Sequence, residues 1–205
     1  MRSSSIIRLP VRGERASAPL ICLLDLQVEY VADGRPLALG GREPWTSNCR
    51  RLLAFARERR LPIAHFRQLR RDGLFNPATP LSDWIEEYRP RPFEMVFERP
   101  QPSCYASQSF AEFLDNMEYP QLVIAGLTGE GACLATAIDA FHRNHECIFV
   151  ADASTSRQLS ERGEEEVHNF LSDLIELYAE VTTTSAVMLK YSRSAGGQRQ
   201  VSRRE

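Results

Sequence analysis

The stretch Ile124-Ala-Gly-Leu-Thr-Gly-Glu-Gly-Ala-Cys-Leu-Ala-Thr-Ala-Ile-Asp-Ala140 decides the fold of this chain. The apolar residues 122–125 predict a buried strand, the glycines that follow predict a turn, and the apolar spacing from Leu134 to Phe141 predicts a helix. A strand that enters a helix through such a turn brings free backbone N–H groups and the positive end of the helix dipole to one place. The turn is therefore a candidate site for an anion or an oxyanion, and Cys133 beside it is a candidate nucleophile.

Strand and helix patterns alternate along the rest of the chain. Short apolar runs predict further strands at residues 19–24, 61–66, 93–97, 147–150 and 181–183. Helical patterns cover residues 45–59, 110–116, 159–179 and 186–189. This alternation predicts an α/β fold: a three-layer, Rossmann-like sandwich in which a mostly parallel sheet of about six strands carries helices on both faces. Ligands of such sheets bind at the carboxyl ends of the strands, where Asp25 and the glycine turn both fall.

The composition limits the function classes that we consider. A length of 205 residues suits one domain, which we expect at residues 17–190, between a flexible arm at 1–16 and a basic, disordered tail at 191–205. A net charge of −2 does not indicate the basic surface that nucleic-acid-binding proteins carry. No apolar run approaches the roughly 20 residues that are needed to cross a bilayer. We therefore expect neither a nucleic-acid partner nor a membrane partner.

The cysteines and histidines indicate a reduced, metal-free protein. The five cysteines include no C-x-x-C pair, and their odd number is typical of free thiols in the cytoplasm. The first residues lack the continuous apolar core of a secretory signal, which also favours a cytoplasmic location. The four histidines show no spacing that is typical of zinc ligands. We expect no metal and no other cofactor.

Three motifs in chain order resemble the isochorismatase-like (cysteine hydrolase) family, and together they span nearly the whole predicted domain. Residues 23–27, LLDLQ, are similar to the D-x-Q motif of the first strand. Residues 96–105, VFERPQPSCY, are similar to the segment that bears the catalytic lysine of the family. Residues 126–140, followed by FVADA at 149–153, are similar to the nucleophile loop, its helix and the next strand. The resemblance implies that Asp25 is the catalytic acid/base.

Two positions depart from the pattern of the cysteine members. Counting back from Thr136 in the T-A-x-D-A run places the nucleophile position at Ala132, and Cys133 is turned from it by about 100° if the segment is helical. The lysine position is occupied by Arg99. A guanidinium holds a carboxylate bidentately and stays charged, so we predict an ion pair between Asp25 and Arg99 that lowers the pKa of Asp25. We interpret Cys133 as a packed neighbour of the reactive position.

Isochorismatases proper have a similar arrangement, G-C-x-x-T-A-x-D-A, with glycine where this chain has Ala132. The resemblance implies that these enzymes work without a covalent step. Their aspartate protonates the enol-ether carbon of isochorismate, and water then completes the cleavage to pyruvate and a dihydroxybenzoate-type diol. The metal-bearing members of the family carry a D-x-H signature that this chain lacks. The resemblance also implies a homodimer or a higher homo-oligomer.

Other residues are candidates for substrate binding, and two of them, Gln27 and Trp84, also have a purely structural interpretation. Gln27 follows the same strand as Asp25 and can donate to a substrate oxygen, or it is a satisfied polar side chain. Tyr105 falls where the family has a phenylalanine that walls the pocket. Trp84, in the long loop at 68–92, is a candidate lid or a core residue. The backbone around Thr128, Gly129 and Gly131 to Cys133 is the candidate cradle for an anion.

Two functions from different classes stay open. The first is a hydrolase that acts on a small anionic substrate, with Asp25 as acid/base and Arg99 as anion clamp. The second is a degenerate family member that binds a small molecule or a protein partner without chemistry, since both Ala132 and Arg99 replace the expected residues. Nicotinamidase-like amide hydrolysis through an acyl-enzyme is disfavoured because it needs the missing thiol.

Overall fold

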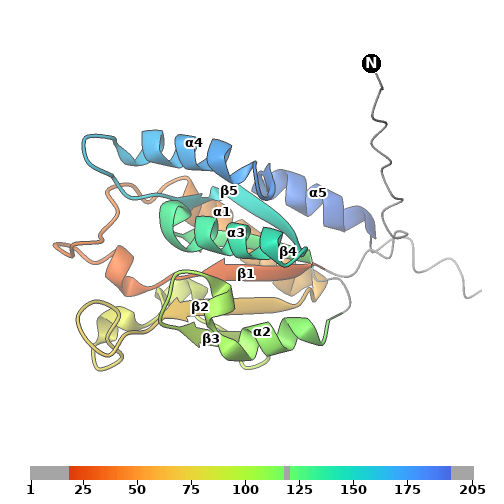
Figure 1. The fold of residues 1–205 in the computed structure, drawn as a ribbon, viewed down its shortest axis with the longest axis horizontal. Coiled ribbons are helices and arrows are strands. Elements are labelled where there is room, and N and C mark those ends of the chain that lie inside the picture. The colour runs from red at the N-terminus through yellow and green to blue at the C-terminus, as the bar shows by residue number, and fades with distance from the viewer. Residues whose placement is uncertain (1–18, 118–120, 195–205) are drawn as a thin grey trace, which may run out of the picture.

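Six strands form the centre of the computed structural model, which describes residues 19–117 and 121–194, and they lie in the order β3-β2-β1-β4-β5-β6 (Figure 1). Their bounds are Leu20–Leu24 (β1), Ile63–Gln68 (β2), Met95–Arg99 (β3), Gln121–Leu127 (β4), Glu146–Thr155 (β5) and Glu180–Thr182 (β6). Every pairing in this sheet is parallel. The predicted α/β fold with a mostly parallel sheet is confirmed, and the described sheet is parallel throughout.

Helices cover both faces of the sheet, which confirms the predicted three-layer sandwich (Figure 1). Their bounds are Trp45–Arg59 (α1), Gln108–Asp115 (α2), Leu134–His142 (α3), Glu164–Ile175 (α4) and Thr184–Ser194 (α5). Helices α1 and α5 share one apolar cluster with one face of the sheet, and α2, α3 and α4 share a second cluster with the other face. None of the helices in the described parts of the chain is long and apolar enough to cross a membrane.

Strand β1 lies at the topological switch point of the sheet, where the ligands of open α/β sheets bind. Its side chains alternate between the two apolar clusters and all are buried, which explains its continuous apolar sequence. Strand β1 pairs with β2 on one side and with β4 on the other. The connections after β1 and after β4 therefore leave the sheet in opposite directions, and a crevice outside the carboxyl ends of the strands is expected there. Asp25 directly follows β1 at this switch point.

Several predicted elements differ in their bounds, and the last two helices show the physical reasons most clearly. The helix predicted at 159–179 is shorter, because residues 159–162 form a tight turn in which Leu159 pairs with Arg162. Ser160 adopts a positive φ of 54° and Gly163 precedes α4, so helical backbone begins only at Glu164. The last helix is longer than predicted and continues through 191–194, the first residues of the predicted tail. The predicted arm at 1–16 and the remainder of the tail lie outside the described residues.

Candidate active site

Asp25 is held in an uncommon backbone conformation at the carboxyl end of β1. Its φ is 48°, in the left-handed region that few residues other than glycine adopt, although aspartate is enriched there. The N–H of Asp25 donates to the carbonyl of Phe66, and its own carbonyl accepts from the N–H of Gln27. These bonds hold the sharp turn after β1. The carboxyl group is therefore presented at the carboxyl edge of the sheet.

Arg99 reaches Asp25 from the end of β3, two strands away. Its Nη2 donates to Oδ2 of Asp25 at 2.9 Å, and both side chains are at most 1% exposed. The predicted ion pair between the two residues is confirmed. The contact uses one nitrogen only, because Nη1 of Arg99 donates instead to the backbone carbonyl of Gln101 at 2.7 Å. The guanidinium therefore joins Asp25 to the segment that follows β3.

The electrostatic outcome of the pair differs from the sequence-based prediction. Burial raises the pKa of Asp25 above its ordinary value, and the Arg99 guanidinium offsets only part of this rise. The predicted lowering of the pKa is wrong, because removing the carboxylate from water costs more than one charge-assisted hydrogen bond returns. Among the described residues, Oδ1 of Asp25 and Nε of Arg99 have no hydrogen-bond partner. Buried polar atoms without partners are rare, and they are the atoms that a substrate or a water can satisfy.

The glycine turn joins β4 to α3 through one turn of π-helix at Gly129–Cys133. The N–H groups of Gly131 and Cys133 both donate to the carbonyl of Thr128, at 3.2 and 3.1 Å. Two of the three donors from Gly131 to Cys133 are thus used inside the turn. The carbonyl of Thr128 therefore occupies part of the expected anion cradle in this conformation, and the cradle stays a prediction.

Close packing explains two glycines of this segment. Gly126 has a φ of 118°, and a Cβ at this position would lie 2.2 Å from the carbonyl oxygen of Leu24. A Cβ on Gly129 would lie 2.5 Å from Oγ of Ser156. The first glycine lets β4 pass close to the end of β1, next to Asp25. The second lets the turn rest directly on the residue that follows β5.

Ala132 and Cys133 lie in the apolar cluster formed with α2, α3 and α4. Ala132 is 3% exposed and has only a methyl group at the position where the sequence resemblance places the nucleophile. Cys133 is fully buried, and its Sγ points to the carbonyl of Gly126 at 3.9 Å. Burial raises the pKa of Cys133 well above its ordinary value. A thiol that is buried and protonated is a packing residue rather than a nucleophile, in line with our interpretation of the sequence.

Gln27 has a structural role in this conformation. Its Nε2 donates to the carbonyls of Gln68 and Ser82, and its Oε1 accepts from the N–H of Gln68. The side chain is fully buried. Because both donors are engaged by backbone, the amide ties the end of β2 to the long loop and has no free N–H for a substrate. The structural alternative therefore describes this residue better.

The described contacts of the Tyr105 and Trp84 side chains are with residues outside the ion pair. The hydroxyl of Tyr105 bonds with Nδ1 of His145 at 2.8 Å, just before β5 begins and thus at the opposite edge of the sheet from Asp25. Trp84 is buried against β2, edge-on to His65 and under the guanidinium of Arg67. Tyr105 is thus placed away from Asp25, whereas the backbone of Trp84 bridges to that of Gln27, two residues after Asp25. Core packing, one of the two interpretations of Trp84, fits its burial.

Two features of the site were not predicted from the sequence. Glu130, in the glycine turn, forms an ion pair with Arg157 at 2.7 Å, and its side chain is 8% exposed. The ring of Tyr30 packs at a tilt against that of Phe75, and both burial and the nearby Asp25 charge raise the pKa of its hydroxyl. The side chain of Glu130 is therefore paired and largely buried. Arg157 follows β5, and no local pattern connects it with the turn.

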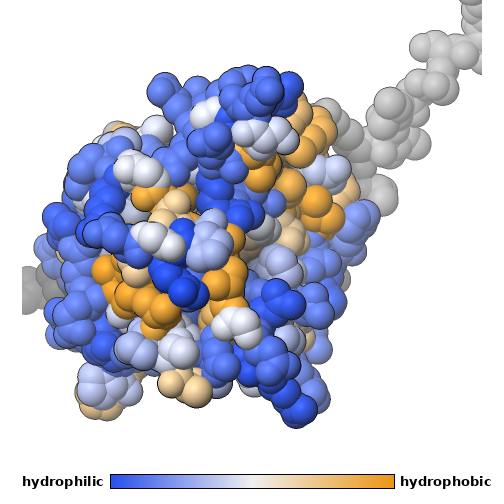
Figure 2. All heavy atoms as spheres, turned by 90° about the vertical axis from the view of Figure 1, so that its left-hand side faces the viewer, coloured by the Kyte–Doolittle hydropathy of each residue, from blue (hydrophilic) through white to orange (hydrophobic). Residues whose placement is uncertain are grey.

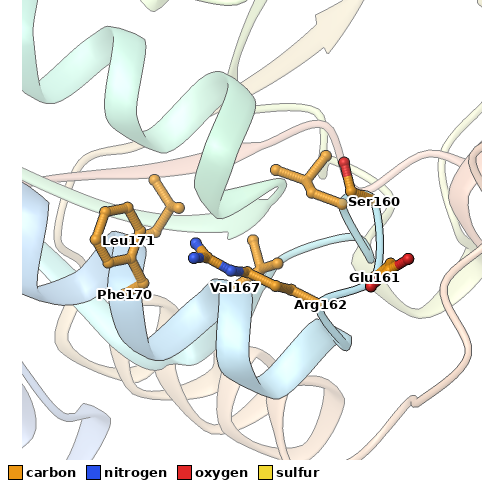
Figure 3. A pocket seen from close by; sticks show the side chains of 7 residues that line it. Ser160, Glu161, Arg162, Val167, Phe170 and Leu171 are labelled. Carbon is orange, nitrogen blue, oxygen red and sulfur yellow. The ribbon is translucent and has the colours of Figure 1, made fainter.

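Neither Asp25 nor Arg99 lines either of two cavities in the described structure. One cavity of about 530 Å³ lies at the ends of β2 and β3 and is lined by Leu69, Arg70, Arg71, Asp72, Pro100 and Gln101. The other, of about 540 Å³, lies between the 159–162 turn and α4 (Figure 3). Figure 2 looks onto the carboxyl edge of the sheet and shows hydrophilic side chains in the middle of this face, between apolar patches. No group of three or more possible metal ligands occurs among the residues that the structure describes.

Comparisons with known proteins agree with this geometry. The family model for the isochorismatase domain matches residues 19–186. An isochorismatase from Pseudomonas putida KT2440 is similar in structure, with a TM-score of 0.74 and 26% identity over 82% of this chain and 89% of that chain. An isochorismatase-like hydrolase from Alkaliphilus metalliredigens has a TM-score of 0.74 and 19% identity, covering 85% of this chain and 99% of its own.

A third solved structure broadens the comparison to a different enzyme. N-carbamoylsarcosine amidase from Thermoplasma acidophilum is similar with a TM-score of 0.66 and 20% identity, over 82% of this chain and 97% of that chain. No curated protein matches this chain by sequence. At this level of identity the amidase shares the fold, and its substrate says nothing about the substrate of this chain.

Proposed function

Because the chain belongs to the isochorismatase family, we propose that it is a hydrolase that acts on a small anionic substrate without a metal and without a covalent cysteine intermediate. The observation that carries this proposal is the buried pair of Asp25 and Arg99. It supplies a carboxyl group with one free oxygen and a fixed positive charge beside it. Ala132 and the buried Cys133 supply no thiolate.

Asp25 serves as the acid/base in this proposal. Burial raises the pKa of its carboxyl group, so the protonated form persists closer to neutral pH than that of an exposed aspartate. A general acid is most effective when its pKa lies near the working pH. After Asp25 gives its proton to the substrate, the carboxylate that remains is stabilised by Arg99, and its oxygens can orient the attacking water.

For isochorismate the reaction balances with one water. The proton from Asp25 goes to the methylene carbon of the enol ether, and water adds to the adjacent carbon, which has become electron-poor. The hemiketal then collapses, the C–O bond breaks, and pyruvate and a diol leave. Asp25 takes back one proton over the cycle. No step needs a residue at position 132 that can attack carbon.

The closed state of the site favours a second candidate function, binding without chemistry. Asp25 and Arg99 are almost completely buried, and Glu130 pairs with Arg157 in the turn beside them. A substrate reaches Asp25 only if part of this cover moves. A family member that has lost its activity would not need such movement. Turnover separates the two candidates, since only the first requires it.

The test measures pyruvate release from isochorismate by the purified protein, followed by a panel of amides and ureido acids. We expect turnover of at least one compound, lost in Asp25→Asn and retained in Asp173→Asn, which removes an exposed carboxylate on α4. If no compound is turned over, or if Asp25→Asn is as active as the wild type, the hydrolase proposal fails. A homodimer or larger homo-oligomer and a cytoplasmic location stay predictions from the sequence.

A further inference from the structure

The cavity of about 530 Å³ lies next to the segment that carries the buried ion pair. One of the residues that line it, Gln101, accepts a hydrogen bond from Arg99. Its volume falls in the range of small-molecule sites. One wall is formed by residues 69–72, which follow β2, and the other by Pro100 and Gln101, which follow β3. Both segments leave the sheet at its carboxyl edge, the edge at which Asp25 follows β1.

Arg99 links this cavity to the candidate catalytic carboxyl group. One terminal nitrogen of its guanidinium donates to Asp25 at 2.9 Å, and the other donates to the carbonyl of Gln101, which lines the cavity, at 2.7 Å. The carbonyl of Arg99 also accepts from the N–H of Leu69, on the opposite wall. Arg99 therefore connects Asp25 to the backbone of a residue that lines the cavity.

The charged side chains of the cavity favour an anion. Arg70 and Arg71 contribute two guanidinium groups, and Asp72 contributes one carboxylate. Within the described parts of the chain, neither arginine forms an ion pair, whereas the nearby Arg67 is paired with Glu98. Guanidinium groups bind carboxylates and phosphates through paired, charge-assisted hydrogen bonds. The net positive charge of this wall has no counterpart on the opposite wall, which is formed by Pro100 and Gln101.

The turn that carries the two arginines is anchored to the core. The N–H of Arg70 donates to the carbonyl of Phe75, and the side chain of Asn76 donates to the carbonyl of Arg71. Phe75 is buried, and its ring lies 5.3 Å from that of Tyr30, centroid to centroid. The backbone of Arg70 and Arg71 is thereby fixed relative to the site, so less freedom is lost when an anion binds.

We propose that this cavity binds a carboxylate or phosphate group of the substrate, with Arg70 and Arg71 as its donors. The part of the inference that calls the ligand a substrate rests on the proposed function. The anion site itself does not, because it follows from the cavity and its charges. The substrate class is then a small molecule with its scissile bond beside Asp25 and a second, anionic group on the side of β3.

The test uses inorganic phosphate and malonate as probes, titrated calorimetrically into the intact protein at low ionic strength. The double variant Arg70→Gln/Arg71→Gln should bind both probes at least about tenfold more weakly, since the charge-assisted hydrogen bonds are lost. The matched control is Arg59→Gln/Arg60→Gln, which removes two adjacent arginines at the end of α1. We expect the control to bind like the wild type. Circular dichroism verifies that all three proteins are folded.

Equal affinity of the three proteins, or no binding to the wild type, overturns the anion site. Kinetics then test the link to the substrate. Arg70→Gln/Arg71→Gln should raise KM for the identified substrate and leave kcat nearly unchanged, and an unchanged KM contradicts the link. Asp25→Asn should lower turnover by at least about 100-fold while it still binds phosphate. If Asp25→Asn keeps its activity, the proposed function fails, and the phosphate titration still decides whether the anion site exists.

Discussion

The ends of β1 and β3 and the turn after β4 differ in what they leave available for chemistry. At the first region, Asp25 and Arg99 form a buried ion pair in which one carboxyl oxygen and one guanidinium nitrogen have no partner among the described residues. At the second, Thr128 accepts two N–H groups of the turn, and Cys133 is packed in the apolar cluster. Both regions are buried, but of the two only the first has buried side-chain polar atoms without a partner.

The glycine turn is therefore a weaker candidate for substrate contact than the carboxyl group of Asp25. The turn has the sequence of an anion site, and Cys133 lies at its helix entrance, yet its geometry is that of a tightly packed support. Leaving polar atoms unpaired in a protein interior costs free energy, and such strain is found at functional sites more than elsewhere. Asp25 and Arg99 are therefore the better candidates for direct contact with a substrate.

The largest effect should come from Asp25→Asn, which keeps the shape of the side chain and removes its acid function. We expect kcat to fall by between about 10² and 10⁴, the usual contribution of a general acid or base. Steady-state kinetics on the identified substrate measure this change. Asp173→Asn on α4 is the matched control, and an equal loss in both variants would contradict the special role of Asp25.

Arg99→Met should cause the largest loss of stability. The substitution leaves the carboxylate of Asp25 buried without its partner, which costs about 3–5 kcal/mol of the free energy of unfolding at neutral pH. The loss should shrink at acidic pH, where Asp25 takes up a proton. Urea unfolding measures both values. Arg162→Met, which removes an exposed pair with Glu166, should change the free energy of unfolding by less than about 1 kcal/mol.

Gly129→Ala should destabilise the second region by steric overlap. The new Cβ would lie 2.5 Å from Oγ of Ser156, and overpacking of this kind costs about 1–3 kcal/mol. Ser156→Ala removes the clashing atom, so the double variant should recover part of the loss. Chemical unfolding of the two single variants and the double variant forms a cycle that measures the coupling. Purely additive values would show that the two positions do not touch.

The smallest effect is expected at Cys133. Its thiol is fully buried and the pKa of the thiol is raised, so iodoacetamide at pH 6–7 should label it no faster than the buried Cys147. Cys133→Ala should keep kcat within about twofold, a change too small for loss of a nucleophile. Mass spectrometry after labelling provides the first result, and kinetics provide the second. Rapid labelling of Cys133 would show that its thiol is accessible and reactive, and the glycine turn would then be the better candidate for the reactive region.

Much of the fold could be predicted because local patterns are sufficient for it. The bounds of α1 match the prediction, since its inward residues recur at helical spacing. The parallel sheet follows from short apolar strands that alternate with helices. The start of α4 was missed because the apolar spacing continues through Leu159, while Ser160 and Gly163 end the helical backbone. At the start of α4, the backbone conformation of the turn therefore determined the helix boundary, and the apolar spacing did not.

The site was harder to predict than the fold. The ion pair of Asp25 and Arg99 followed from the family resemblance, which supplied two positions far apart in sequence. The direction of the Tyr105 side chain depends on His145, and the engagement of Gln27 depends on two carbonyls of other segments. The pKa of Asp25 depends on burial, which a sequence motif does not contain. Contacts between distant segments determine these properties.

The pKa of the Asp25 side chain tests the central claim most directly, and ¹³C NMR of the labelled carboxyl group measures it. We predict a pKa above the ordinary value of 3.8, because burial outweighs the attraction of Arg99. The protonated form would then be lost only at higher pH, and the rate of an acid-catalysed step should fall as the pH rises through that pKa. The raised pKa should also lower the free energy of unfolding as the pH rises from the ordinary value to the folded one, a dependence absent in Asp25→Asn. A pKa at or below 3.8 would contradict the assignment of Asp25 as the buried acid.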